Sequence, residues 1–344
     1  MKRLIALCLI FALFPTVSSI SASAESTTVE KDYSGKTVSI LGDSISTFKG
    51  YVPEDDGTNL KHYYTYPSIT LLKEVEQTWW MQTIRKLDAQ LGINDSWSGT
   101  RVSNFTELNG GQTGRDVCMA SVTRIKNLGS NGTPDLILFY GGTNDVGNKV
   151  ELGKFDPATA PTQVDLEAVI WDDFAQAYTA AIMRLQHFYP NAEIYAMLPN
   201  RTLYFSDEKF APYIEIMQAI CDHYDVETID LRDSGIQLSM LPDGVHPDID
   251  GMQLISEKVV SSIMHTHTFI QQDDETYHLC SCGKAQSHRF VTSTGFLWSQ
   301  SSICSICAFA FTNNTIPIIL CSATAFVIVS GIIGSIIVLK KKRK

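Results

Sequence analysis

Five short apolar runs alternate with longer segments of helical period between residues 36 and 264, and this alternation limits the fold most strongly. The runs are Val38–Leu41, Ile93–Trp97, Leu136–Tyr140, Ile194–Leu198 and Val226–Ile229. The helix candidates are Thr78–Leu91, Arg115–Leu128, Asp172–Tyr189, Glu208–Tyr224 and Ile249–Met264. Alternation of this kind is typical of a parallel sheet with helices on both faces. The sequence therefore predicts an α/β domain over residues 30–264 with a five-stranded parallel sheet.

Polar and turn-forming residues stand at the carboxyl ends of three predicted strands and before the last helix. They are Gly42-Asp43-Ser44, Ser98-Gly99, Gly141-Gly142-Thr143-Asn144-Asp145 and Asp243-Gly244-Val245-His246-Pro247. Each segment by itself is an ordinary turn or helix cap. Parallel sheets of this class bind ligands at the carboxyl ends of their strands. The four segments together, in this order, therefore indicate one functional site at one edge of the sheet.

The residue types in these loops match the needs of acyl transfer. The hydroxyl of Ser44 becomes a nucleophile when an imidazole accepts its proton, and His246 offers one. Asp243, three residues earlier, can hold that imidazole in one tautomer. The tetrahedral oxyanion needs donors, for which the N–H groups of Ser44 and Gly99 and the amide of Asn144 are candidates. Asp43 can serve a structural role, with its carboxylate bound to loop N–H groups.

The segments LGDS, SWSG, GGTND and DGVHPD resemble the four blocks of the SGNH (GDSL-type) hydrolases over Lys36–Met264. Ile45 replaces the leucine that gives the family its name, which is a conservative change. The resemblance implies a flavodoxin-like three-layer α/β/α fold and ester hydrolysis without a cofactor. It also implies the site residues: Ser44 as nucleophile, Ser44, Gly99 and Asn144 as oxyanion donors, and His246 as base oriented by Asp243.

The sequence says less about the substrate than about the type of reaction. Family members that are secreted often resemble carbohydrate esterases, and the aromatic segment Gly50–Gln77 suits stacking on sugar rings. We therefore expect removal of acetyl groups from a small-molecule or polysaccharide ester. A lipase or thioesterase of the same fold and a catalytically idle surface-binding module are the alternatives. Arg101, Asp145 and Asp248 are the polar residues first expected to contact substrate.

The two ends of the chain predict export and membrane anchoring. Residues 1–24 combine Lys2-Arg3, an apolar run and Ala22-Ser23-Ala24, which is the pattern of a secretory signal peptide; a retained anchor is the alternative. Residues 316–339 carry no charge and precede five basic residues at 340–344. Such a stretch is long enough to span a bilayer, and the cations mark the cytoplasmic side. We expect a single-pass membrane protein whose catalytic domain is extracellular.

The charge of the exported part excludes some partners. The 27 basic residues include two in the signal segment and five in the tail, which leaves 20 against 37 acidic residues. A domain this acidic is unsuited to nucleic acid or to an anionic membrane surface. The sequence leaves the oligomeric state open.

Residues 265–315 form a Cys/His-rich segment between the hydrolase domain and the predicted span. Cys280, Cys282, Cys304 and Cys307 could hold one structural Zn²⁺, and His265, His267, His278 and His288 surround them. Two disulfides are the alternative outside the cell. The segment resembles small Cys/His ribbon-like modules, which favours zinc. Cys118 and Cys221, in predicted helices, are expected to be buried thiols.

Overall fold

The computed structural model describes residues 31–53, 64–68, 71–104, 118–167 and 173–267, together with six later strands. These strands are β6 (Phe269–Gln271), β7 (Tyr277–Cys280), β8 (Ala285–Ser287), β9 (Phe290–Ser293), β10 (Gln300–Cys304) and β11 (Ala310–Asn313). Cys280 is the one residue among them whose side chain is described. The predicted signal peptide (1–24), membrane span (316–339) and basic tail (340–344) lie outside the described residues.

The region from residue 37 to residue 264 is built on a five-stranded parallel sheet, as predicted. Its strands are β1 (Thr37–Gly42), β2 (Gln90–Ser96), β3 (Leu136–Tyr140), β4 (Glu193–Leu198) and β5 (Glu227–Asp230). Their order is β2-β1-β3-β4-β5, and every neighbouring pair is parallel. This order is that of the flavodoxin-like doubly wound sheets. The predicted fold class of this region is confirmed.

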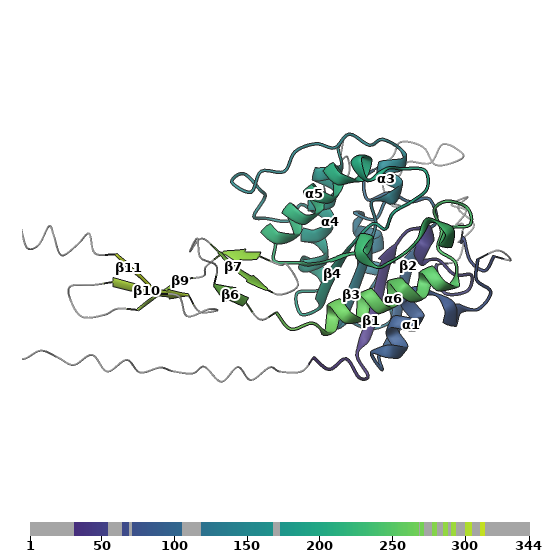
Figure 1. Cartoon of the computed structure of the whole chain (residues 1–344), viewed down its shortest axis with the longest axis horizontal. Coiled ribbons are helices and arrows are strands. Elements are labelled where there is room, and N and C mark those ends of the chain that lie inside the picture. Colours follow the sequence, from purple (N-terminus) through teal and green to yellow (C-terminus); the bar gives the residue numbers. More distant parts are fainter. Residues whose placement is uncertain are drawn as a thin grey trace, which may run out of the picture.

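Helices cover both faces of the sheet (Figure 1). One face carries α1 (Trp79–Lys86) and α6 (Ile249–Met264), which pack on each other. The other carries α2 (Val122–Asn127), α4 (Phe174–Phe188) and α5 (Asp207–His223). A short helix, α3 (Thr143–Gly147), begins three residues after β3 and was not predicted.

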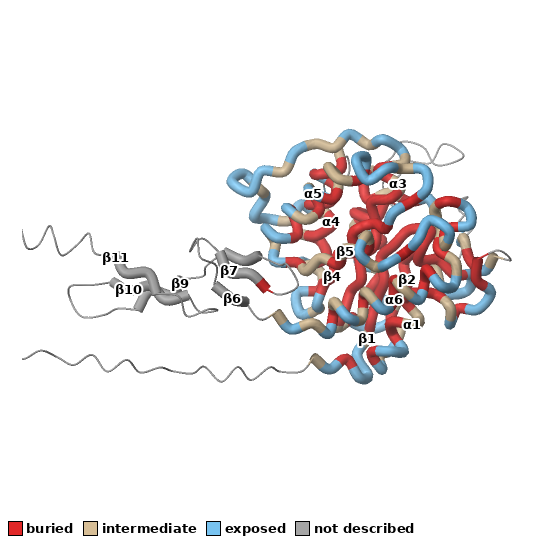
Figure 2. Tube along the Cα trace, viewed as in Figure 1, coloured by how far each residue is buried: buried red, intermediate tan, exposed pale blue. Residues whose placement is uncertain are grey.

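The central strands of the sheet are buried (Figure 2). Their side chains divide between two cores. In β3, Leu136, Leu138 and Tyr140 belong to the core under α1 and α6. Ile137 and Phe139 belong to the core under α2, α4 and α5. Successive side chains of a strand point to opposite faces, so a strand between two helical layers needs apolar residues at every position. This requirement explains the continuous apolar runs in the sequence.

Two helices are shorter than the sequence predicts. The first ends at Lys86 rather than Leu91, because Asp88 has a φ of 54° and β2 begins at Gln90. A positive φ at a non-glycine residue interrupts helical backbone. The second helix begins at Val122 rather than Arg115, and the Ser121 side chain accepts a hydrogen bond from Arg124 N–H as its N-cap.

The strands after α6 form two separate three-stranded sheets, β6-β7-β8 and β11-β10-β9. Cys280 lies in the first sheet and Cys304 in the second, whereas Cys282 and Cys307 lie outside the described residues. The four-cysteine zinc site therefore stays a prediction. Within the described part of the chain, no helix combines the length and apolar character needed to cross a membrane.

Candidate active site

Strand register brings three of the four predicted loops to one edge of the sheet. Gly42, the last residue of β1, is paired with Ser96 of β2 on one side and with Tyr140 of β3 on the other. Both partners are also the last residues of their strands. The segments that follow, at residues 43, 97 and 141, consequently leave the sheet at the same level.

Ser44 stands at the start of a short 3₁₀ helix, Ser44–Ser46, directly after β1. Asp43 is in an extended conformation and accepts a hydrogen bond from Ile45 N–H at 3.0 Å, so its carboxylate caps this turn. The turn bends the chain sharply at the strand end, and Ser44 is left 7% exposed. A largely shielded hydroxyl at the edge of a sheet is suited to reaction with a bound substrate.

His246 lies between the other two residues predicted for the triad. Its Nε2 atom is 2.8 Å from Ser44 Oγ, and its Nδ1 atom is 2.7 Å from Asp243 Oδ2. The ring of Tyr66 packs edge-on against the imidazole, with ring centres 6.2 Å apart. Gly244 has a φ of 86°, a left-handed conformation that lets the chain turn between the carboxylate and the imidazole.

Asp243 is held as an anion. Its Oδ1 atom accepts the backbone N–H groups of Val245 at 3.0 Å and His246 at 2.8 Å. Burial alone would raise the pKa of Asp243, but these bonds and the imidazole outweigh it, so the pKa lies below its ordinary value. An ionised carboxylate on Nδ1 fixes the tautomer in which Nε2 can accept the proton of Ser44.

The predicted oxyanion donors lie on loops that are bonded to each other. Asn144 donates from Nδ2 to the carbonyl of Thr100 at 2.8 Å, which uses one of its two amide hydrogens. Gly99, the residue before Thr100, has a φ of 78°, and the space where a side chain would project is open. Trp97 N–H donates to the carbonyl of Gly42 at 3.2 Å, which ties this loop to the Ser44 turn.

Comparison with known proteins matches residues 36–263 to the family model described as GDSL-like lipase/acylhydrolase. The chain belongs to this family. A structure of a GDSL-like lipase-family protein from Bacteroides ovatus is 33% identical, covers 68% of this chain and all of its own, and gives a TM-score of 0.52. Another, from Bacteroides uniformis, is 31% identical, covers 67% of this chain and 95% of its own, and gives a TM-score of 0.50. The comparison with curated proteins found no match.

Two residues of this GDSL-family chain that were expected to contact substrate form structural contacts. Asp145 is fully buried and accepts hydrogen bonds from the N–H groups of Val102 and Ser103 and from the Ser103 hydroxyl. Asp248 caps α6 by accepting from Gly251 N–H at 3.0 Å. The expectation for Asp145 was wrong because a carboxylate with no exposed surface cannot reach a ligand.

Arg124 is a supporting residue that the sequence did not reveal. Its guanidinium is fully buried and forms an ion pair with Asp95, with Nε 2.8 Å from Oδ1. It also donates to the carbonyl of Gly42 at 3.0 Å and to the Thr100 hydroxyl at 3.1 Å. One side chain of α2 thus joins the end of β1, the end of β2 and the loop that carries Gly99. A lone arginine in a short helical segment gives no sequence signal for this role.

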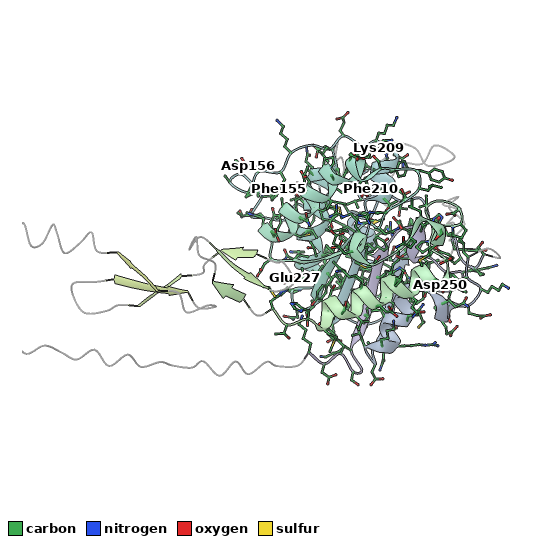
Figure 3. The ribbon with its side chains drawn as sticks, viewed as in Figure 1. Phe155, Asp156, Lys209, Phe210, Glu227 and Asp250 are labelled. Atoms are coloured by element: carbon green, nitrogen blue, oxygen red, sulfur yellow. The ribbon has the colours of Figure 1, made fainter. Side chains whose placement is uncertain are left out.

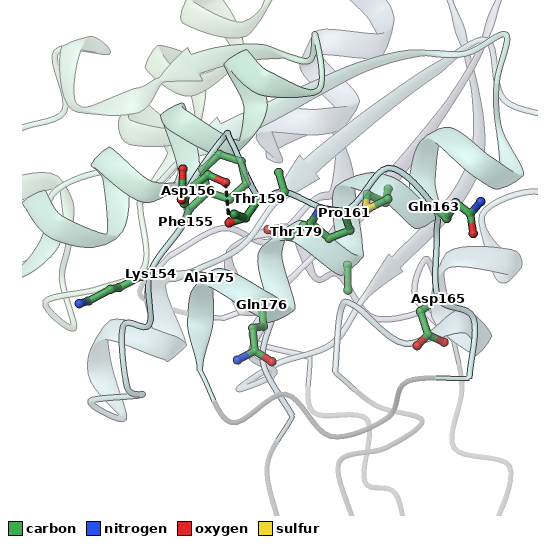
Figure 4. Close-up of a pocket in the computed structure, with 13 residues that line it drawn as sticks. Lys154, Phe155, Asp156, Thr159, Pro161, Gln163, Asp165, Ala175, Gln176 and Thr179 are labelled. Atoms are coloured by element: carbon green, nitrogen blue, oxygen red, sulfur yellow. Dashed lines mark hydrogen bonds between the residues drawn. The ribbon is translucent and has the colours of Figure 1, made fainter.

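A cavity in the described part of the chain lies away from these residues. It has a volume of about 300 Å³ and lies between residues 154–165 and α4, lined by Phe155, Pro161 and Thr179 among others (Figure 4). None of Ser44, Asp243 and His246 lines it. The hydrogen-bonded loops at the carboxyl edge of the sheet, rather than this cavity, are the candidate active site.

Proposed function

We propose that the chain is a serine ester hydrolase in which Ser44, His246 and Asp243 form the catalytic triad. The observation that carries the proposal is the continuous pair of contacts at His246, 2.8 Å to Ser44 Oγ and 2.7 Å to Asp243 Oδ2. Membership of the GDSL-like lipase/acylhydrolase family supports ester hydrolysis as the reaction class.

The mechanism follows from these contacts. Ser44 Oγ attacks the ester carbonyl carbon while its proton passes to Nε2 of His246. The tetrahedral intermediate collapses when the imidazolium returns this proton to the departing alcohol, which leaves an acyl group on Ser44. A water molecule then attacks the acyl carbon, gives its proton to His246, and the carboxylic acid is released as Ser44 recovers its proton.

The oxyanion of each intermediate needs donors that are already oriented. Under this proposal they are the backbone N–H groups of Ser44 and Gly99 and the second Nδ2 hydrogen of Asn144. Fixed donors at this position typically lower the barrier by about 3–4 kcal/mol each. The bond from Asn144 to Thr100 supports this assignment because it fixes the amide beside the loop that carries Gly99.

We further propose that the natural substrate is an acetylated carbohydrate. Two exposed tyrosines flank the site loops: Tyr64, 41% exposed, and Tyr204, 61% exposed. Thr65, next to Tyr64, lies 3.1 Å from the Ser98 hydroxyl, and Leu203 N–H donates to Gly244 at 2.7 Å. Exposed aromatic rings beside a polar site suit stacking on sugar rings.

A substrate panel tests both parts of the proposal. Purified chain should hydrolyse an aryl acetate and an acetylated polysaccharide, and Ser44→Ala should lose both activities. Tyr204→Ala should raise KM for the polysaccharide and leave the aryl acetate unchanged, because only the longer substrate reaches the ring. Preference for long-chain lipid esters or thioesters would overturn the carbohydrate assignment. No hydrolysis of any ester would favour a surface-binding module.

The location proposed for this activity is the outer face of the cell membrane. It is supported by the signal-like segment at 1–24, the 24 uncharged residues at 316–339 and the basic residues that follow them. The acidic balance of the exported part agrees with a soluble substrate rather than an anionic polymer such as nucleic acid.

A further inference from the structure

Two histidines and a cysteine meet where the hydrolase domain ends. His265 and His267 follow α6 directly, and Cys280 is the last residue of β7. One potential ligand atom of each residue lies within 4.8 Å of the corresponding atoms of the other two. His265 Nε2 lies 3.2 Å from Cys280 Sγ. No catalytic role assigned above involves these three residues.

We propose that His265, His267 and Cys280 bind a transition-metal ion of the Zn²⁺ class. Nitrogen and sulfur ligands at about 2.0 and 2.3 Å from a tetrahedral zinc ion lie about 3.5 Å from each other. The separation of 3.2 Å between His265 and Cys280 is close to this edge length. The ligand atoms, one from each of the three residues, all lie within 4.8 Å of one another. Small side-chain rotations would therefore bring each pair of ligand atoms to the separation of about 3.5 Å.

Glu227 supplies the outer contact that metal-binding histidines usually have. Its Oε2 atom lies 3.3 Å from His267 Nε2, which leaves Nδ1 of the same ring to face an ion. Histidine ligands almost always donate their second ring N–H to a carboxylate or carbonyl. Glu227 begins β5 and lies on the side of the domain that faces β6 and β7 (Figure 3). The cluster therefore has both a set of ligands and a group that orients one of them.

The burial of the cluster also fits a bound ion. Cys280 is 1% exposed, and the two histidines are partly buried. A buried thiol beside imidazole nitrogens is a good source of a thiolate ligand once a cation is present. Three protein ligands leave the fourth tetrahedral position for water or another donor.

The position of this site defines its role. His265 and His267 directly follow α6, the last helix of the hydrolase domain, whereas Cys280 belongs to the sheet β6-β7-β8. An ion bound by all three would crosslink this sheet to α6 and β5. The ion is structural under this proposal, and it takes Cys280 away from the four-cysteine set considered from the sequence.

Metal content of the full-length chain in detergent tests the proposal. After reconstitution with Zn²⁺ and removal of free metal, wild type should retain one ion that His265→Ala, His267→Ala and Cys280→Ser each lose. The exposed His187, in the last turn of α4, provides the matched control, and His187→Ala should retain the ion. Cys304→Ser should also retain it, because Cys304 lies in the other sheet.

A second variant keeps the test independent of folding. Glu227→Gln preserves size and should weaken zinc affinity by about 10–100-fold, as the loss of an outer-shell partner typically does. Co²⁺ bound to wild type should show a thiolate-to-cobalt absorption band that Cys280→Ser lacks. The proposal is overturned if wild type retains no zinc, if Cys280 is found in a disulfide, or if Cys304→Ser loses the ion while His265→Ala keeps it.

Discussion

His246 is held by two residues of very different exposure. Ser44 is 7% exposed, whereas the side chain of Asp243 is 48% exposed. Water can therefore replace part of what the carboxylate does for the imidazole, but nothing replaces the hydroxyl. The two residues should contribute unequally to catalysis.

Asp243→Asn tests this inequality. Replacement of a fully buried triad aspartate costs about 10⁴-fold in kcat, and we expect a smaller loss of about 10²–10³-fold because Asp243 is partly solvated. The measurement is kcat on an aryl acetate, with Ser44→Ala as the inactive reference. Equal loss in the two variants would contradict the prediction.

The pH dependence should also reflect Asp243. Its pKa lies below the ordinary value near 4, so it remains ionised as the pH falls toward that value. The contribution of this carboxylate to folding stability is present above its unfolded-state pKa and is lost as the pH falls through the lower, folded-state pKa. Asp243 should therefore add no ionisation of its own to the pH profile of kcat above about pH 4, measured on an aryl acetate.

Asp43 has the opposite behaviour. Burial raises its pKa to about 7, and its Oδ2 atom has no hydrogen-bond partner among the described residues. The folded state then binds more protons than the unfolded state between about pH 4 and pH 7, so stability falls as the pH rises through this range.

Asp43→Asn should remove this pH dependence, because asparagine can still accept the bond from Ile45 but does not ionise. Urea unfolding of both proteins at pH 5 and pH 8 gives the measurement. Between pH 5 and about pH 7, wild type should lose up to about 1.4 kcal/mol of unfolding free energy per pH unit more than the variant, and little more above pH 7. If the free energy of unfolding changes equally between pH 5 and pH 8 in both proteins, Asp43 does not titrate in the folded state as described.

At the scale of elements, the site depends on α2 as much as on the strands. Arg124 of α2 contacts Gly42, Asp95 and Thr100, which belong to three segments of the active-site edge. Removal of one partner of a buried ion pair is strongly destabilising because the other charge is left uncompensated.

Arg124→Met should therefore lower the free energy of unfolding by about 3–5 kcal/mol. The matched control is Arg85→Met, because Arg85 pairs with Glu76 at 3.1 Å on the exposed surface. Exposed pairs contribute at most about 1 kcal/mol. Chemical denaturation of the two variants makes the comparison, and similar losses in both would show that the Arg124 network is not stabilising.

The elements also differ in how far the sequence predicts them. All five strands and five of the helices were predicted, because apolar period and spacing depend on local sequence. The predicted end of α1 was wrong because Asp88 adopts a positive φ, which an aspartate in the sequence does not predict. The expectation that Asp145 contacts substrate was wrong. Its place next to Asn144 in the sequence does not reveal that its carboxylate is buried. Arg124 was missed because its three contacts are distant in sequence.

At the scale of the whole molecule, the described residues contain the hydrolase domain and two small sheets, while both predicted membrane-related segments lie outside them. The loops of the active site could be predicted because three motifs mark strand ends and a fourth precedes the last helix. The contact of His265 with Cys280 could not, because it depends on how β7 meets the end of α6.

Truncation after residue 315 tests the proposed membrane attachment. The full-length chain should be found in the membrane fraction, and the truncated chain should be released into the medium with unchanged activity on an aryl acetate. Truncation removes residues 316–339, an uncharged stretch of 24 residues that is long enough to cross a bilayer. Retention of the truncated chain in the membrane would indicate another attachment, such as an uncleaved segment at 1–24.

Covalent labelling is the most direct measurement of the central assignment. A fluorophosphonate reacts with a serine only where a neighbouring base activates the hydroxyl, and peptide mass spectrometry locates the adduct. The account predicts a single adduct on Ser44 that is absent from Ser44→Ala and greatly slowed in His246→Ala. Wild type that forms no adduct, or that carries it on a different serine, would contradict the account.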